Sequence, residues 1–137
     1  MLIHGTAVAV DGRGLLIIGA SGAGKSSLAL QLMSMGARLV ADDRVMVRAA
    51  NGQLLLGPHE NLAGKIEARG IGILNADHLS EVAARLVVDL DTPETARIPP
   101  PRQKTILDVS LHCVQKQSSP AFPAAIMQYL KAGIAEN

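Results

Sequence analysis

The chain has 137 residues, of which 48% are hydrophobic and 18% charged, with a formal net charge of +1 at pH 7. This length and composition predict one globular domain, residues 1–137, with a sizeable core. The near-neutral charge argues against a nucleic-acid partner, and the lack of a long apolar segment or secretory signal predicts a soluble cytoplasmic protein.

The first third of the chain predicts a β-hairpin or two adjacent strands, followed by a helix and a short strand. Residues 2–10 and 14–19 are rich in apolar strand formers and are separated by a turn signal, DGRG. Residues 25–35 predict a helix, because leucines recur four positions apart and Gly36 follows where a C-terminal cap belongs. Residues 39–43, LVADD, predict a short strand that ends in two carboxylates.

The rest of the chain is predicted to be mostly strands, with loops at 57–65 and 92–104 and one C-terminal helix at 118–134. The predicted strand segments are 44–57, a hairpin around Asn51-Gly52, then 66–74, 86–91 and 105–114. Cys113, the single cysteine, is interpreted as a small hydrophobe in the last of these strands rather than as a nucleophile.

A glycine-rich segment at residues 19–26, GASGAGKS, matches the G-x-x-x-x-G-K-[ST] pattern of phosphate-binding loops and lies between a predicted strand and a predicted helix. Glycines let the backbone wrap a phosphate, and the N–H groups and the helix N-terminus then stabilise its charge. Lys25 would reach the β- and γ-phosphates and Ser26 would coordinate Mg²⁺. An ordinary glycine-rich turn is the alternative. The predicted nucleotide-binding residues are Gly19, Ala20, Ser21, Gly22, Ala23, Gly24, Lys25 and Ser26.

Two adjacent carboxylates, Asp42 and Asp43, end the predicted strand that follows this loop. Because successive strand side chains point in opposite directions, the two should face different environments. One can hold a metal ion or its waters while the other accepts a proton from an attacking hydroxyl. A solvated acidic turn is the alternative interpretation.

Several other polar residues allow two interpretations each. His4 is either part of a site or a surface histidine. Glu67 and Arg69 are expected on one face of a strand, either as an ion pair or as part of a site. Cations around the proline-rich segment form either a solvated face or a mobile anion clamp; they are Arg97, Arg102 and Lys104.

Four ordered segments together resemble the HPr kinase/phosphorylase family, whose members act on a seryl residue of a small phosphocarrier protein. They are IHG at 3–5, GASGAGKS at 19–26, GARLVADDRV at 36–45 and IEARGIGI at 66–73. The resemblance implies an α/β fold, a P-loop kinase domain of the phosphoenolpyruvate carboxykinase-like type. Such a domain is strand-rich, with a phosphate-loop helix and a C-terminal helix.

The resemblance also implies catalytic roles for individual residues. His4 matches the family's catalytic histidine and Lys25 the loop lysine. Asp43 matches the residue that takes the serine proton in the kinase direction and returns it in reverse. Arg97 matches a catalytic arginine, and the segment at 100–105 falls where the family places a loop needed for dephosphorylation.

The cofactors that the resemblance implies are ATP and Mg²⁺. Ser26 and Glu67 match metal ligands, and Asp42 is expected beside them. The implied reaction transfers the ATP γ-phosphoryl group to a serine of an HPr-like phosphocarrier protein, and in reverse inorganic phosphate attacks phosphoserine to give pyrophosphate. The resemblance further implies a homo-oligomer, a hexamer, with no nucleic-acid or membrane partner.

The sequence departs from the family pattern in several respects. Ser27 stands where the family commonly has an acidic residue. The chain is expected to be a short form without the family's N-terminal domain and with a shorter C-terminal helical region. The proline-rich segment also differs, so phosphorylase activity, oligomer and regulation do not follow from the resemblance alone.

Two other classes of function stay open. A small-molecule kinase or NTPase would use the same loop, although neither an N-K-x-D element nor an arginine-rich lid segment is present. A non-catalytic ATP-sensing regulatory module would be consistent with Ser27.

Overall fold

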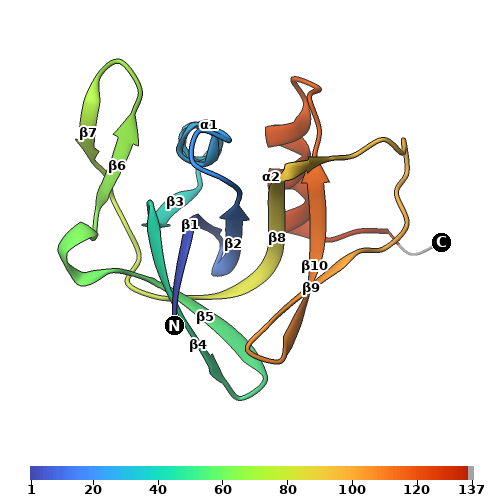
Figure 1. Cartoon of the computed structure of the whole chain (residues 1–137), viewed down its shortest axis with the longest axis horizontal. Helices are drawn as coiled ribbons and strands as arrows, with labels where there is room; N and C mark the ends of the chain where they lie inside the picture. Colours follow the sequence, from blue (N-terminus) through green and yellow to red (C-terminus); the bar gives the residue numbers. More distant parts are fainter. Residues whose placement is uncertain (136–137) are drawn as a thin grey trace.

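Ten strands and two α-helices make up residues 1–135, the part of the chain that the computed structural model describes (Figure 1). This strand-rich, mixed α/β architecture confirms the predicted fold class at that level. The helices are α1 (Lys25–Ser34) and α2 (Phe122–Ala132), and a 3₁₀ turn spans Glu60–Leu62. The strands are β1 (Leu2–Val10), β2 (Arg13–Ile18), β3 (Arg38–Ala41), β4 (Arg44–Ala50), β5 (Gln53–Pro58), β6 (Lys65–Ala68), β7 (Gly72–Asn75), β8 (Val82–Pro93), β9 (Gln103–Ile106) and β10 (Val109–Lys116).

Eight of these strands form one sheet in the order β2-β1-β4-β5-β8-β10-β9, with β3 added beside β1. Because β2 also pairs with β8, the strands β1, β2, β8, β5 and β4 close into a ring. The strand β8 curves strongly to make these contacts (Figure 1). It runs parallel to β2 and β10, whereas the other pairings of the sheet are antiparallel. The remaining strands, β6 and β7, form a separate hairpin.

The central strands are buried on both faces, which explains why they read as continuous apolar runs in the sequence. On β2, Leu15 and Ile17 face a core shared with the two helices, while Leu16 faces a second core inside the ring of strands. On β1, Val8 faces the core shared with the helices, and Ala7 faces the core inside the ring of strands. The sheet therefore presents one face to α1 and α2 and closes the other on itself.

Both predicted hairpins with short turns are confirmed. The β1–β2 pair closes with Val10 opposite Arg13, and the β4–β5 pair closes with Ala50 opposite Gln53. The two turn residues of the second hairpin are Asn51-Gly52, which have φ angles of 53° and 77°. Asparagine and glycine tolerate this left-handed conformation best, so the sequence signal has a direct physical cause.

The two predicted helices are confirmed, with shifted ends. Helix α1 ends at Ser34, and Gly36 follows with a φ of 108°, as expected of a residue that terminates a helix. Helix α2 begins at Phe122, four residues later than the predicted start, with a proline in its first turn. Neither helix in residues 1–135 is long and apolar enough to cross a membrane.

Two predictions about strands are wrong in detail. The segment 105–114 is not one strand, because a turn at Leu107-Asp108, with φ angles of 48° and 62°, divides it between β9 and β10. The segment 66–74 contains two strands rather than one, and the second begins at Gly72. Arg69 therefore lies in a turn, not on a strand face with Glu67.

The proline-rich loop (residues 94–102) is anchored at both ends. The Arg102 guanidinium donates two hydrogen bonds to the Glu94 carboxylate, at 3.0 and 3.1 Å, and that carboxylate also accepts from the backbone N–H of Ala96. The Glu94 N–H donates to the carbonyl of Lys116 on β10. The loop is thus tied to the sheet while its middle, including Ile98, is exposed.

Candidate active site

The segment at 19–26 forms a tight loop between the end of β2 and the start of α1. Gly22 and Gly24 have φ angles of 83° and 101°, a left-handed conformation that costs glycine little and other residues more. Gly24 caps the helix, whose first N–H groups have no partner within the helix. An anion that enters the loop therefore meets backbone donors and the positive end of the helix dipole.

Lys25 occupies the centre of this loop. Its Nζ donates to the carbonyl oxygens of Gly19 at 2.7 Å and Ala20 at 2.9 Å, and the residue is only 8% exposed. The loop backbone thus holds the ammonium group beside the space that the glycines enclose. A phosphate in that space would be neutralised at short range by a charge that is already in place.

The start of the loop is held by Asp91, at the carboxyl end of β8. Its carboxylate accepts from the Ala20 N–H at 2.9 and 3.1 Å. Because β2 and β8 are parallel neighbours, their carboxyl ends meet at the same edge of the sheet, beside the phosphate loop. Asp91 therefore fixes the loop from the adjacent strand.

Asp42 follows β3 and is buried against the loop. Its Oδ1 accepts from the Ser26 hydroxyl at 2.7 Å and from the Thr6 hydroxyl at 2.9 Å, and its Oδ2 accepts from the Glu67 N–H at 3.0 Å. One carboxylate thus joins three separate parts of the chain, namely α1, β1 and the β6–β7 hairpin.

Asp43 points elsewhere, as the sequence predicted, and its side chain is 61% exposed. Its Oδ1 lies 3.0 Å from Nε2 of His4, and its Oδ2 lies 3.9 Å from Nε of Arg44. The φ of Asp43 is 68°, so the chain turns here instead of continuing the strand. The turn separates the two carboxylates, and the hydrogen bond to His4 orients the exposed one.

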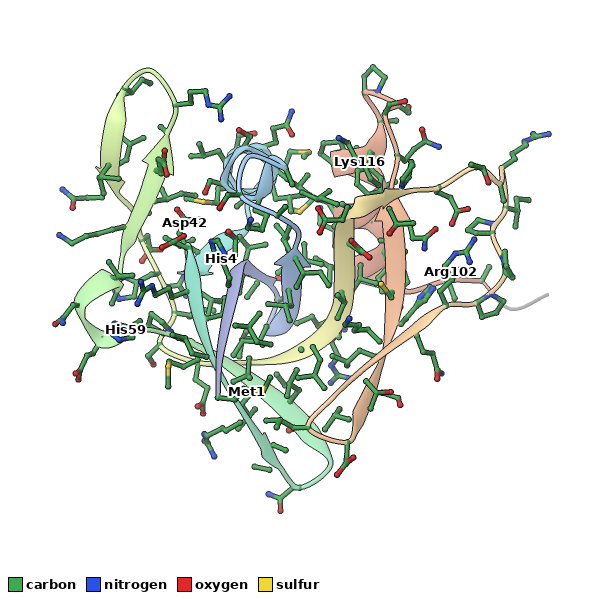
Figure 2. All side chains as sticks on the ribbon, in the orientation of Figure 1. Met1, His4, Asp42, His59, Arg102 and Lys116 are labelled. Carbon is green, nitrogen blue, oxygen red and sulfur yellow. The ribbon has the colours of Figure 1, made fainter. Side chains whose placement is uncertain are left out.

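A cavity of about 280 Å³ brings most of the predicted residues together. Figure 2 shows His4 and Asp42 near α1, on the side of the molecule that carries the β6–β7 hairpin. Ser27, the residue that departs from the family pattern, is exposed at the rim. The residues that line the cavity are His4, Thr6, Ser21, Gly22, Gly24, Lys25, Ser26, Ser27, Asp43, Glu67 and Arg69.

The oxygen atoms of this cavity suit a magnesium–nucleotide complex better than a metal held by protein alone. Ser26 and Glu67 line the cavity, and Asp42, outside the lining, is hydrogen-bonded to Ser26; all three carry hard oxygen donors, the type that Mg²⁺ prefers. Within residues 1–135, however, no three His, Cys, Asp or Glu side chains lie close enough to form a metal centre. Mg²⁺ commonly uses one or two carboxylates and completes its shell with water and substrate phosphates.

Arg97 is not brought to this cavity. It lies exposed in the proline-rich loop, which projects from the end of the molecule opposite the β6–β7 hairpin (Figure 1). Arg102, labelled in Figure 2, is on that same far side and is paired with Glu94. The physical reason is the pairing of β8 with β10, which directs the loop away from β1 and α1.

A second, larger cavity of about 600 Å³ lies beneath the proline-rich loop and is mainly apolar. The hydrogen bonds from Arg102 hold the pKa of Glu94 below its usual value. Burial raises the pKa of the Cys113 thiol and of the Tyr129 hydroxyl, which lies 2.9 Å from Nδ1 of His112. The predicted buried position of Cys113 is thus confirmed, and these residues lie apart from the phosphate loop.

Two residues of the candidate site were missed by the sequence analysis. Thr6 is two positions after His4 on a strand, so it shares that face and could have been found from the alternation. Asp91 ends the predicted strand 86–91 and lies near the carboxyl end of β8, so the pairing of parallel β2 and β8 would have drawn attention to it.

Comparison with known sequences gives one family. The model of the HPr Serine kinase C-terminal domain matches residues 1–90. The HPr kinase/phosphorylase of Treponema pallidum (strain Nichols) is 37% identical over 127 residues, which cover 82% of this chain and 40% of that relative. The HPr kinase/phosphorylase of Bacillus cytotoxicus is 49% identical over 74 residues, which cover 53% of this chain and 24% of the relative. The chain therefore spans less than half the length of these curated relatives.

A solved structure described as the Hpr(Ser) kinase/phosphatase from Coxiella burnetii has a similar fold. The TM-score is 0.80, the sequence identity is 23%, and the match covers 96% of this chain and 94% of that one. At this identity the likeness concerns the fold, and it agrees with the mixed α/β architecture described above.

Proposed function

This chain belongs to the HPr Serine kinase C-terminal domain family, and we propose that it transfers the γ-phosphoryl group of ATP to a seryl hydroxyl of an HPr-like phosphocarrier protein. The observation that carries the proposal is the placement of two differently held carboxylates beside one phosphate loop. Asp42 is buried against Ser26, whereas Asp43 is exposed and held by His4. Protein kinases use both kinds, one carboxylate near the metal and one near the acceptor hydroxyl.

The nucleotide would bind with its phosphates in the loop at 19–26. The backbone N–H groups and the ammonium group of Lys25 would contact phosphate oxygens and stabilise charge that develops on the transferred group. Lys25 would exchange its carbonyl partners, Gly19 and Ala20, for phosphate oxygens. This preorganisation lowers the cost of bringing a cation to the reacting group.

Mg²⁺ would be held by Ser26, Asp42 and Glu67 together with the nucleotide. When bound, the ion supplies charge neutralisation at the phosphates. Asp42 would orient the Ser26 hydroxyl, to which it is already hydrogen-bonded at 2.7 Å. Its bond to the Glu67 N–H would keep the start of the β6–β7 hairpin beside the loop.

Asp43 is the proposed general base. The seryl oxygen attacks the γ-phosphorus, its proton passes to Asp43, and the bond to the bridging oxygen breaks to release ADP. His4 is proposed to orient the carboxylate through their 3.0 Å contact. In reverse, inorganic phosphate attacks phosphoserine, Asp43 returns the proton to the seryl oxygen, and pyrophosphate is formed.

The proposal extends to the architecture and setting of the chain. We assign residues 1–137 to a single catalytic domain of the P-loop, phosphoenolpyruvate carboxykinase-like type, working in the cytoplasm as a homo-oligomer. The ring of strands with a phosphate-loop helix supports this type. No role is assigned to Arg97, because its loop lies at the other end of the molecule.

The Asp43→Asn variant tests the proposed base. Asparagine cannot accept the proton, so turnover should fall by about 10²–10⁴-fold, while nucleotide binding measured by titration should stay within about twofold. Turnover close to that of the unsubstituted chain would contradict the assignment.

The alternative functions give different outcomes. A small-molecule kinase or NTPase would consume ATP without labelling the carrier protein. An ATP-sensing module, the alternative favoured by Ser27 at the cavity rim, would bind ATP without consuming it.

A further inference from the structure

One face of the β6–β7 hairpin packs on the rest of the molecule, and the Glu67 N–H at its edge donates to Asp42. Its strands pair with each other, with Glu67 opposite Ile73 and Ile66 opposite Leu74. Ile66 is 1% exposed and packs in the core that α1 shares, with Leu74 against it. Opposed residues point to the same side of a two-stranded sheet, so Glu67 and Ile73 share the other, outer face.

This outer face carries an apolar surface that nothing in residues 1–135 covers. Ile73 is 65% exposed on it, and Ile71, in the adjoining turn, is 77% exposed. The same hairpin contributes Glu67 and Arg69 to the lining of the phosphate cavity. Ile73 is therefore the cross-strand neighbour of a residue that lines the cavity, Glu67, and Ile71 follows another, Arg69, by two positions.

We propose that Ile71 and Ile73 are the docking contact for the protein acceptor, a partner that presents an apolar patch beside its phosphorylatable hydroxyl. This inference rests on the proposed function and deepens it by assigning part of the acceptor's binding surface. Glu67 and Arg69 line the cavity whereas Ile71 and Ile73 do not, so a small metabolite bound inside it would not need the two isoleucines. A folded protein that inserts a seryl side chain must cover the surrounding rim.

The positively charged residues of the hairpin indicate which charge the partner surface should carry. Lys65 lies on the same outer face, two positions before Glu67, and Arg69 follows in the turn. Both cations are exposed, and they belong to the same hairpin as the two isoleucines. The fitting partner surface is therefore apolar with carboxylates at its edge, since complementary charges steer association and fix orientation.

The chain supplies a matched control for this proposal. Ile98 is 81% exposed, but it lies in the proline-rich loop at the opposite end of the molecule. An isoleucine-to-serine change there removes the same side chain from a position that is at least as exposed. Its effect on acceptor binding separates a specific contact from a general change in surface hydrophobicity.

The experiment compares Ile71→Ser, Ile73→Ser and Ile98→Ser. The first readout is the dissociation constant for an HPr-like phosphocarrier whose acceptor serine is replaced by alanine, measured by calorimetry. The second is KM and kcat for the unsubstituted carrier. We expect each hairpin change to raise the dissociation constant and KM about five- to tenfold with kcat within twofold, and Ile98→Ser to change neither.

The outcomes separate the two proposals. Three results would overturn the docking proposal. The dissociation constant and KM could stay within twofold of the unsubstituted values in both hairpin variants, or they could rise as much in Ile98→Ser as in the hairpin variants. The third result is that the unsubstituted chain does not bind the carrier. Carrier binding that is weakened by the hairpin changes, but without phosphoryl transfer by the unsubstituted chain, would support docking and contradict the proposed kinase function.

Discussion

Replacing Asp42 with asparagine should destabilise the fold itself, unlike the same change at Asp43. Asp42 is 6% exposed and accepts from the Thr6 and Ser26 hydroxyls and from the Glu67 N–H. An asparagine has one acceptor oxygen in place of two. If that oxygen keeps the two hydroxyl contacts, the amide NH₂ faces the Glu67 N–H, and two donors are left opposed.

The magnitude follows from these contacts. A buried donor left unsatisfied costs about 1–3 kcal/mol, and the two hydroxyl bonds lose the strengthening that a charged acceptor gives. We therefore expect Asp42→Asn to lower the free energy of unfolding by about 2–4 kcal/mol. The Asp43 side chain is 61% exposed, and an exposed pair such as its contact with His4 contributes about 0–1 kcal/mol.

Urea unfolding of the unsubstituted chain, Asp42→Asn and Asp43→Asn, followed by far-UV circular dichroism, measures the differences in their free energy of unfolding. The unfolding midpoint should fall strongly for Asp42→Asn and little for Asp43→Asn, with similar m-values. If Asp42→Asn unfolds within about 0.5 kcal/mol of the unsubstituted chain, the three hydrogen bonds do not hold the site together as described.

Three other expectations follow from the structure. Lys25→Ala should slow phosphoryl transfer at least about 100-fold in a labelled-ATP assay, because the loop loses its fixed cation, and near-normal turnover would contradict this. The lowered pKa of Glu94 means that its pair with Arg102 stabilises the proline-rich loop fully above the ordinary carboxyl pKa of 4.5, and that this stabilisation disappears as pH falls through the lower folded-state value. The Ala96 amide resonance, whose N–H donates to Glu94, should shift in that acid range and stay constant in Glu94→Gln, and a shift that persists in the variant would exclude this origin. Because burial raises the pKa of Cys113, a thiol reagent at pH 7 should react much more slowly with the folded chain than with the chain in urea, and equal rates would contradict its buried position.

The local elements could be predicted well because their signals are local. Asn51-Gly52 specifies a hairpin turn through its own backbone preferences, and the phosphate loop follows from glycine positions and one lysine. The turn at Leu107-Asp108 could not be predicted in the same way, since leucine rarely adopts a positive φ and the alternation of residues 105–114 is that of a single strand.

The arrangement in space was less accessible from the sequence. The two environments of Asp42 and Asp43 were expected from strand alternation, yet the buried contact with Thr6 depends on the pairing of β1 with β3. The distance of Arg97 from the cavity depends on the pairing of β8 with β10. This pairing joins strands that are far apart in the sequence, and no local motif predicts it. The roles of the individual site residues stay predictions until they are measured.

Phosphoryl transfer to a carrier protein can be measured in one reaction. The purified chain is incubated with Mg²⁺, [γ-³²P]ATP and an HPr-like phosphocarrier, and the carrier is then analysed for labelled phosphoserine. We predict labelled phosphoserine with the unsubstituted chain and its loss with Asp43→Asn. ATP binding without a labelled protein, or label that appears only in a small metabolite, would contradict the proposed function.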